Sequence, residues 1–226
     1  MEREAPDRRW IILAVFAAIA VAVVAAILIG RSGGSDEEES SSTASGCKEV
    51  ADPKPKDVSL KAPKQTVKPS DELTARVETS CGEFAIALDS KRAPKTVNSF
   101  VYLSEEGFYD GLPFHRIIPG FVVQGGDPTG GGSGGPGYSV DEKPPSNLAY
   151  TKGVVAMAKT EAEPPGRSGS QFYVVVGADA GLPPEYALVG KVSEGLDVVE
   201  KIAGLGSQAG TPKQTVVIER VEIESS

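Results

Sequence analysis

The chain has 226 residues, of which 40% are hydrophobic, and a formal net charge of −8 at pH 7. The hydrophobic share excludes a disordered or fibrous protein and is enough for one or two packed domains. The acidic balance argues against a nucleic-acid partner, because proteins meet nucleic acids through basic surfaces.

The first patterned segment is a run of 20 residues without a charged side chain, from Trp10 to Ile29. About 20 apolar residues in a helix cross the hydrocarbon core of a membrane, so a transmembrane helix is predicted at residues 10–30. A cleaved signal peptide is the alternative, but it requires a shorter apolar core and a small-residue cleavage motif. A lipoprotein attached through Cys47 is a further alternative, although this cysteine lies far beyond the apolar run.

The charges that flank this helix predict its orientation. Arg3, Arg8 and Arg9 precede it, whereas Arg31 alone follows closely. Because positive residues favour the cytoplasmic side, residues 1–9 are predicted to be cytoplasmic. The expected localisation is therefore the cytoplasmic membrane, with a single pass and the globular domain on the extracytoplasmic side.

Residues 31–72 are predicted to form a disordered, Pro-rich linker. Large apolar side chains are scarce in its first half, and prolines alternate with lysines in its second half, which favours extended chain. Cys47 in this linker and Cys81 beyond it are both expected outside the membrane, where a disulfide is permitted. The two thiols are either bridged or free, because sequence alone does not establish that their Cα atoms lie close together.

The globular domain is predicted at residues 73–226 and begins with a β-hairpin. Apolar and polar residues alternate on both sides of a turn at Cys81-Gly82. After Pro94, apolar residues recur at three and four residues, which indicates a helix that ends near Gly107.

Two short strands follow at 114–118 and 121–124, separated by the turn dipeptide Pro119-Gly120. Alternation assigns Phe114, Arg116 and Ile118 to one face of the first strand. In the second strand it places Phe121 and Val123 on the face opposite to Val122 and Gln124. The glycine-rich run at 130–135 matches a dinucleotide-binding pattern only formally, since Pro136-Gly137 prevents the helix that this site requires.

Strands are also predicted at 153–158, 171–176, 187–192 and 215–222, with a helix at 196–203. The pattern predicts a mainly β fold, in which eight antiparallel strands close into a barrel with two capping helices. No metal site is predicted, because the chain has one histidine and two distant cysteines, and no cofactor is expected. Ser170 lacks the setting of a hydrolytic nucleophile.

Three blocks of the sequence carry a resemblance to a known family. Phe114-His115-Arg116-Ile117-Ile118, then Gly120-Phe121 and Gln124-Gly125-Gly126-Asp127, resembles the signature of the cyclophilins, which are peptidyl-prolyl cis/trans isomerases. Residues 154–158, 169–173 and 188–192 resemble further parts of the same family. The similarity covers about residues 74 to 222 and implies the barrel architecture that the pattern predicts.

The resemblance also implies roles for individual residues. Arg116 would be the catalytic residue, Phe121 would line the pocket for the proline ring, and Gln124 would orient the substrate and the arginine. His115 would support the neighbouring arginine. The remaining expected substrate-binding residues are Val122, Ala158, Lys159, Gln171, Tyr173, Leu182 and Tyr186.

Several positions depart from the family pattern. Val122 stands for a commoner Met, Tyr173 for a Phe, Lys159 for an Asn and Tyr186 for a His, while Gly181 falls where many members carry a Trp. Weak cyclosporin binding is therefore expected. The loop at 161–167 joins two active-site strands, and the sequence leaves open whether it only connects them or also modulates peptide entry.

The implied partners are Xaa-Pro-containing polypeptides, bound by a monomer whose N-terminal helix lies in the membrane. The leading hypothesis is an isomerase that assists protein folding outside the cytoplasmic membrane, since slow prolyl isomerisation limits folding. The alternative is a non-catalytic proline-peptide-binding module or chaperone on the same fold, because fold alone does not establish activity.

Overall fold

The computed structural model describes residues 46–225. Within this range no helix is long and apolar enough to cross a membrane. The predicted cytoplasmic N-terminus at 1–9 and transmembrane helix at 10–30 lie outside the described residues and stay predictions.

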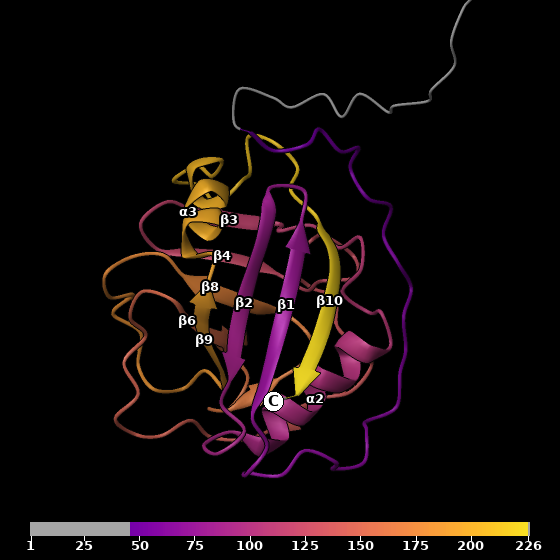
Figure 1. The fold of residues 1–226 in the computed structure, drawn as a ribbon, viewed down its shortest axis with the longest axis vertical. Helices are drawn as coiled ribbons and strands as arrows, with labels where there is room; N and C mark the ends of the chain where they lie inside the picture. The colour runs from indigo at the N-terminus through magenta and orange to yellow at the C-terminus, as the bar shows by residue number, and fades with distance from the viewer. Residues whose placement is uncertain (1–45, 226) are drawn as a thin grey trace, which may run out of the picture. The chain divides into compact units, whose positions relative to one another are not determined.

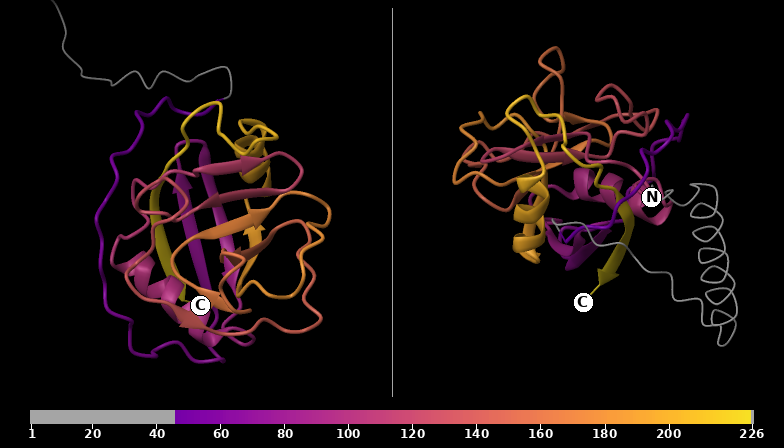
Figure 2. Two further views of the ribbon diagram at one scale, coloured as in Figure 1. Left: turned by 180° about the vertical axis from the view of Figure 1, so that it is seen from behind. Right: turned by 90° about the horizontal axis from the view of Figure 1, so that it is seen from above.

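The domain is built on one antiparallel sheet with the strand order β10-β1-β2-β9-β6-β8-β4-β3. Its strands are β1 (Leu73–Thr79), β2 (Gly82–Leu88), β3 (Arg116–Ile118), β4 (Val122–Gly125), β6 (Val154–Met157), β8 (Phe172–Val175), β9 (Leu188–Glu194) and β10 (Ile218–Ser225). The sheet curls, so that β3, β4 and β8 pass behind β1 and β2 at a steep angle (Figures 1 and 2). The two edges meet through a bridge between Pro113 and Val217.

Two helices and a small second sheet complete the domain. Helix α2 (Pro94–Glu105) and helix α3 (Leu196–Gly204) lie at opposite ends of the curled sheet (Figure 1). Strands β5 (Val140–Asp141) and β7 (Arg167–Ser168) pair with each other. The predicted mainly β architecture, with eight antiparallel strands in its sheet and two helices, is confirmed, whereas the sequence pattern did not predict β5 and β7.

The last strand begins three residues later than predicted, for a reason that the edge contacts explain. Val216 accepts a hydrogen bond from the Phe114 amide at 2.9 Å, and Val217 bridges to Pro113. Residues 215–217 are therefore used to join the two edges of the sheet, and pairing with β1 starts at Ile218.

The strands bury side chains on both faces. Phe100, Phe114, Ile117 and Phe172 belong to a large core inside the curl. A second, smaller cluster lies on the other face and includes Val122, Tyr150, Val154, Ala156, Tyr173, Val175 and Leu188. Burial on both faces explains why β6 and β8 consist almost entirely of buried apolar residues.

Residues 46–72 differ from the predicted linker. They form no helix and no strand beyond a single bridge residue, but they run along the side of the domain as one extended segment (indigo in Figure 1). Val67 is buried, while Val58 and Leu60 pack against the core inside the curl. We call residues 47–67 the strap.

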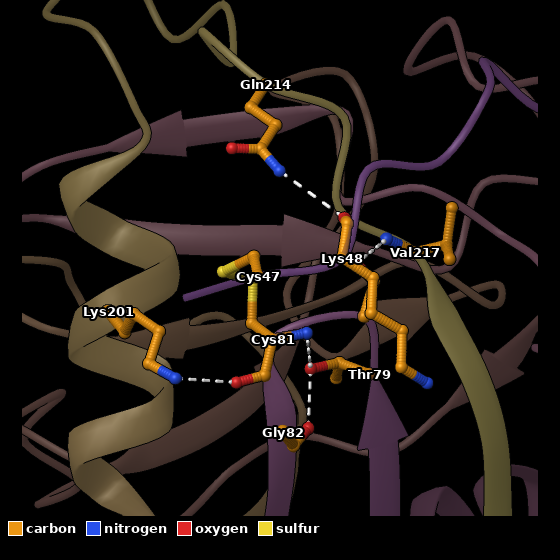
Figure 3. Close-up of a disulfide and its surroundings, with 9 residues drawn as sticks. Cys47, Lys48, Thr79, Cys81, Gly82, Lys201, Gln214 and Val217 are labelled. Carbon is orange, nitrogen blue, oxygen red and sulfur yellow. Dashed lines mark hydrogen bonds between the residues drawn. A yellow bond between two sulfur atoms is a disulfide. The ribbon is translucent and has the colours of Figure 1, made fainter. Parts of the chain in front are cut away.

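A disulfide between Cys47 and Cys81 fixes the start of the strap to the turn between β1 and β2 (Figure 3). Both cysteines are buried. Around the bridge, the Lys48 amide donates to the Ser80 carbonyl at 2.7 Å, and Lys201 of α3 donates to the Cys81 carbonyl at 2.9 Å. The sequence left open whether the two thiols are bridged or free, and in the structure they are bridged.

Candidate active site

The site is organised by a row of residues that the strand register places side by side. Arg116 of β3 pairs with Gln124 of β4, Gln124 pairs with Tyr173 of β8, and Tyr173 pairs with Ala156 of β6. Paired residues in adjacent strands point to the same face of a sheet. The register therefore presents a cation, an amide and an aromatic ring together on the face that carries the smaller core.

Strict alternation fails just before each strand of the β3–β4 hairpin. Phe114 was expected on the face of Arg116, but it lies before β3 and is buried in the core inside the curl. Phe121 was expected opposite Val122, but it follows the turn at Gly120 and packs with Val122 against the smaller core. The turn thus adds an aromatic ring to the face that carries Arg116.

These residues enclose a cavity of about 350 Å³, here called the ring pocket. Each of its lining residues was proposed from the resemblance: Arg116, Phe121, Val122, Gln124, Ala158, Lys159, Tyr173, Leu182 and Tyr186. Five separate segments of the chain contribute to it, so the curl of the sheet and two loops bring the site together.

Arg116 lies at the polar edge of the ring pocket. Its Nη1 donates to Gln124 Oε1 at 3.2 Å, and its guanidinium carbon lies 5.6 Å from the centre of the Phe121 ring. A guanidinium remains charged and offers five N–H donors in a fixed plane, so donors are left for a bound molecule. The ring and the amide hold the guanidinium at the edge of a cavity lined largely by aromatic and aliphatic side chains.

A chain of side-chain hydrogen bonds leads away from the arginine. Gln124 Nε2 donates to Gln171 Oε1 at 3.1 Å, and Gln171 Nε2 donates to the Gly134 carbonyl at 3.0 Å. Gln171 was expected among the substrate-binding residues, but it lines a neighbouring cavity and not the ring pocket. Its observed contacts orient Gln124 and, through it, Arg116.

Three tyrosines form the far wall of the ring pocket. Tyr173 and Tyr186 meet edge to face with ring centres 5.8 Å apart, and Tyr150 packs behind them. Tyr150 Oη donates to the Tyr186 carbonyl at 2.6 Å and accepts from the Tyr186 amide at 2.9 Å. Tyr173 Oη, in contrast, is buried without a hydrogen-bond partner among residues 46–225.

Lys159 lines the ring pocket, and its charged end is held by contacts within the protein. Its side chain is only 4% exposed, and its Nζ lies 3.4 Å from Glu185 Oε2 and 5.4 Å from the centre of the Tyr186 ring. The ammonium also donates to the carbonyls of Thr160 and Glu163. Lys159 therefore fixes the 160–163 turn to the Tyr186 wall, and its charge is satisfied by the protein itself.

The neighbouring cavity, of about 500 Å³, is bounded by the glycine-rich loop, residues 127–137. It shares Gln124, Ala158 and Lys159 with the ring pocket, so one extended peptide can lie across both. Thr160 and Glu163 of the 160–163 turn also line it. Glu163 belongs to the loop at 161–167, for which the sequence left connection and control of peptide entry open. The density of glycines in the glycine-rich loop was a signal of close backbone approach.

His115 and Asp127 lie behind the site, and His115 is not among the residues that line the ring pocket. Burial lowers the pKa of His115, with a smaller opposing effect from Asp127. Burial raises the pKa of Asp127, but hydrogen bonds from Thr129 and the Gly132 and Gly134 amides outweigh it and leave the pKa below its usual value. Asp127 thus accepts hydrogen bonds from the amides of the glycine-rich loop, and the His115 ring lies next to the loop at Gly132.

The arrangement offers donors and an apolar pocket, and no redox or hydrolytic group. In the part of the chain that the structure covers, no group of three or more His, Cys, Asp or Glu side chains is arranged to hold a metal ion. A site of this kind binds an apolar ring beside a peptide group and directs N–H donors at it.

Comparison with known proteins identifies the same chemistry. Residues 74–223 match the family model described as cyclophilin type peptidyl-prolyl cis-trans isomerase. Peptidyl-prolyl cis-trans isomerase B of Streptomyces anulatus is 38% identical over 176 residues, which cover 69% of this chain and 99% of the relative. Peptidyl-prolyl cis-trans isomerase A of Mycobacterium tuberculosis is 38% identical over 177 residues, which cover 70% and 96%.

Solved structures show the same likeness in three dimensions. A cyclophilin type peptidyl-prolyl cis-trans isomerase of Cryptosporidium parvum superposes with a TM-score of 0.63 at 30% identity, covering 69% of this chain and 99% of that one. A second structure of that protein, in the presence of the dipeptide Ala-Pro, has a TM-score of 0.62. Since the family match spans more than half of the sequence and the curated relatives align over nearly their whole length, this chain belongs to the cyclophilin-type peptidyl-prolyl cis-trans isomerases.

Proposed function

We propose that this isomerase binds Xaa-Pro segments of unfolded proteins outside the cytoplasmic membrane and accelerates their rotation with Arg116 as the catalytic residue. The observation that carries the proposal is the position of the Arg116 guanidinium at the edge of the apolar ring pocket. The proline ring of the substrate fills the cavity between Phe121 and Tyr173, which leaves its imide group beside the arginine.

The chemistry requires no proton transfer to or from the protein. Rotation about a peptide bond crosses a barrier of about 18–20 kcal/mol, because resonance stiffens the C–N bond. In the twisted state the nitrogen lone pair is localised and accepts a hydrogen bond from Arg116. Catalysis follows because this contact is stronger in the twisted state than in either planar isomer.

Three observations support the location. The uncharged run Trp10 to Ile29 has the length of a membrane-spanning helix, and Arg3, Arg8 and Arg9 precede it. The Cys47–Cys81 disulfide supports an oxidising compartment, since cytosolic thiols are kept reduced. A reporter fused after Ser226 should be active only outside the cytoplasm, and cytoplasmic activity would contradict the proposed topology.

The mechanism is tested with the full chain in detergent and a short Xaa-Pro peptide. Arg116→Ala should lower kcat/KM at least tenfold, about 1.4 kcal/mol of barrier, without changing the unfolding midpoint appreciably. Arg92→Ala is the matched control, because Arg92 is half-exposed, pairs only with Asp89 and lies outside both cavities. Equal turnover by Arg116→Ala and the parent would show that another group acts on the imide.

A further inference from the structure

The strap lies across the glycine-rich loop, and its main chain donates a hydrogen bond near each end of that loop. The Lys56 amide donates to the Pro128 carbonyl at 2.8 Å, and the Leu60 amide donates to the Pro136 carbonyl at 2.7 Å. Main-chain hydrogen bonds of this length fix the two segments to each other irrespective of side-chain identity. The ends of the loop are thus held by a segment that precedes the family match, which begins at residue 74.

Side chains of the strap make further contacts with the rest of the domain. Lys56 Nζ also donates to the Asp110 carbonyl, and Leu60 packs against the core inside the curl. At Gly137 the approach is so close that a Cβ atom would lie 2.9 Å from Ser59 Oγ and 3.0 Å from Ser59 Cα. Real Cβ contacts are longer than this, so the loop and the strap are packed as one unit.

The strap is itself held at both of its ends. The disulfide fixes Cys47 to Cys81, and beyond the loop the Asn98 side chain of α2 accepts hydrogen bonds from the amides of Thr66 and Val67 at 2.7 and 3.0 Å. An extended chain with few apolar side chains does not hold its place unaided. These anchors therefore supply the rigidity that the loop contacts need.

The glycine-rich loop connects the strap to the reacting group. The Gly134 carbonyl, two residues before the Pro136 contact, accepts from Gln171, which is followed by Gln124 and Arg116 in the hydrogen-bond chain. A shift of the Gly134 carbonyl would remove the partner of Gln171 Nε2 and release the two glutamines. Small displacements of a catalytic group have large effects on rate, because its contact must be made in the twisted state.

We propose that the disulfide-anchored strap is a positioning element of the active site, which holds the glycine-rich loop and through it the orientation of Arg116. The inference rests on the proposed role of Arg116. It adds a dependence on redox state: when a dithiol reductant transfers two electrons and two protons to the Cys47–Cys81 bond, two thiols form and one anchor of the strap is lost.

The decisive variant is Leu60→Pro in the full chain, which deletes the N–H that binds the Pro136 carbonyl. Two matched controls separate this bond from other effects. Leu60→Ala keeps the N–H and removes the packing of the side chain, and Lys61→Pro adds a proline at an exposed position whose amide makes no hydrogen bond within residues 46–225. Cys47→Ser tests the disulfide anchor independently, and remains informative if Leu60→Pro does not fold.

The readouts are kcat and KM on a short Xaa-Pro peptide, together with amide hydrogen exchange. Both Leu60→Pro and Cys47→Ser should loosen the loop that carries Gly134, and loss of the Gln171–Gly134 hydrogen bond predicts a decrease in kcat of about three- to tenfold, with KM within about twofold of the parent. Both controls should stay within about twofold in kcat. Exchange should become faster in residues 127–137 of the two test variants and remain unchanged in β6.

The outcomes are separable. If the loop exchanges faster but kcat is unchanged, the strap supports the loop without positioning Arg116, and the proposal is overturned. If the controls lose as much kcat as Leu60→Pro, the main-chain bond to Pro136 is not the cause and the proposal also fails. If Arg116→Ala lowers kcat but the strap variants do not, this inference is refuted and the proposed function is left intact.

Discussion

The buried hydroxyl of Tyr173 offers a sharp test of the packing around the ring pocket. The side chain is 4% exposed, and its Oη has no hydrogen-bond partner among residues 46–225. Burial raises the pKa of this phenol, so the group stays a neutral hydroxyl in any ordinary buffer. Leaving a buried polar group unpaired costs about 1–3 kcal/mol, a penalty that Tyr173→Phe removes.

We therefore expect Tyr173→Phe to raise the free energy of unfolding by about 1 kcal/mol or more, which is roughly 2–4 °C in Tm for a chain of this size. Tyr150→Phe is the matched control in the same cluster. It deletes a hydroxyl that bonds both the amide and the carbonyl of Tyr186, leaving two partly buried backbone groups without that partner, so it should lower stability by about 1–3 kcal/mol.

The measurement is urea unfolding of parent and variants, followed by circular dichroism, with a shift of the midpoint at constant slope reporting stability. Opposite signs for the two variants are the expected result. Tyr173→Phe less stable than the parent, or a loss of equal size in both variants, would refute the assignment of an unpaired hydroxyl at the ring pocket.

Three further predictions concern the same domain. Burial lowers the pKa of His115, the only histidine, in the folded protein. As pH falls below about 6.5, the unfolded state therefore binds this proton more readily than the folded state, and the free energy of unfolding should fall from pH 7.5 to 5.5. His115→Gln should flatten this dependence in urea unfolding. Gly126→Ala should destabilise the fold strongly, since φ is +84° and a Cβ would lie 2.5 Å from the Ser170 carbonyl oxygen, and a thermal midpoint equal to the parent would contradict this. Cyclosporin should inhibit the parent weakly, and Gly181→Trp should lower the inhibition constant, because a Cβ at Gly181 meets no atom within 4 Å. The φ of +64° at Gly181 should make this variant less stable than the parent. Tight inhibition of the parent would show that this position is misassigned.

The strands and helices could be predicted well because their signals are local. Alternation around Cys81-Gly82 and the three- and four-residue spacing after Pro94 depend only on neighbouring side chains, and β1, β2 and α2 lie where these patterns place them. Strands β5 and β7 are two residues long, so no periodicity precedes them. Their pairing results from tertiary contacts, including the ion pair between Arg167 and Asp141.

The part of the ring pocket that lies on strands could be predicted, because alternation determines which strand residues share a face. Alternation placed Val122 and Gln124 on one face, and the resemblance supplied the loop residues Leu182 and Tyr186. The conformation of Lys159 was not predictable, because its ammonium is satisfied by Glu185 and two carbonyls that only the folded loops bring together. A lysine at a binding site suggests a contact with the ligand, whereas the ammonium of Lys159 contacts groups of the protein itself.

The strap shows most clearly where reasoning from composition ends. Composition measures how much apolar surface a segment can bury, and by that measure residues 47–67 do not fold. Their attachment depends instead on the amides of Lys56, Leu60, Thr66 and Val67, which any residue except proline would supply, and on a disulfide whose partner lies 34 residues away. Neither leaves a periodic or compositional signal. The family match begins at residue 74, yet the packed unit extends back at least to Cys47, so the limit of a family match is not the limit of the structure that positions its active site.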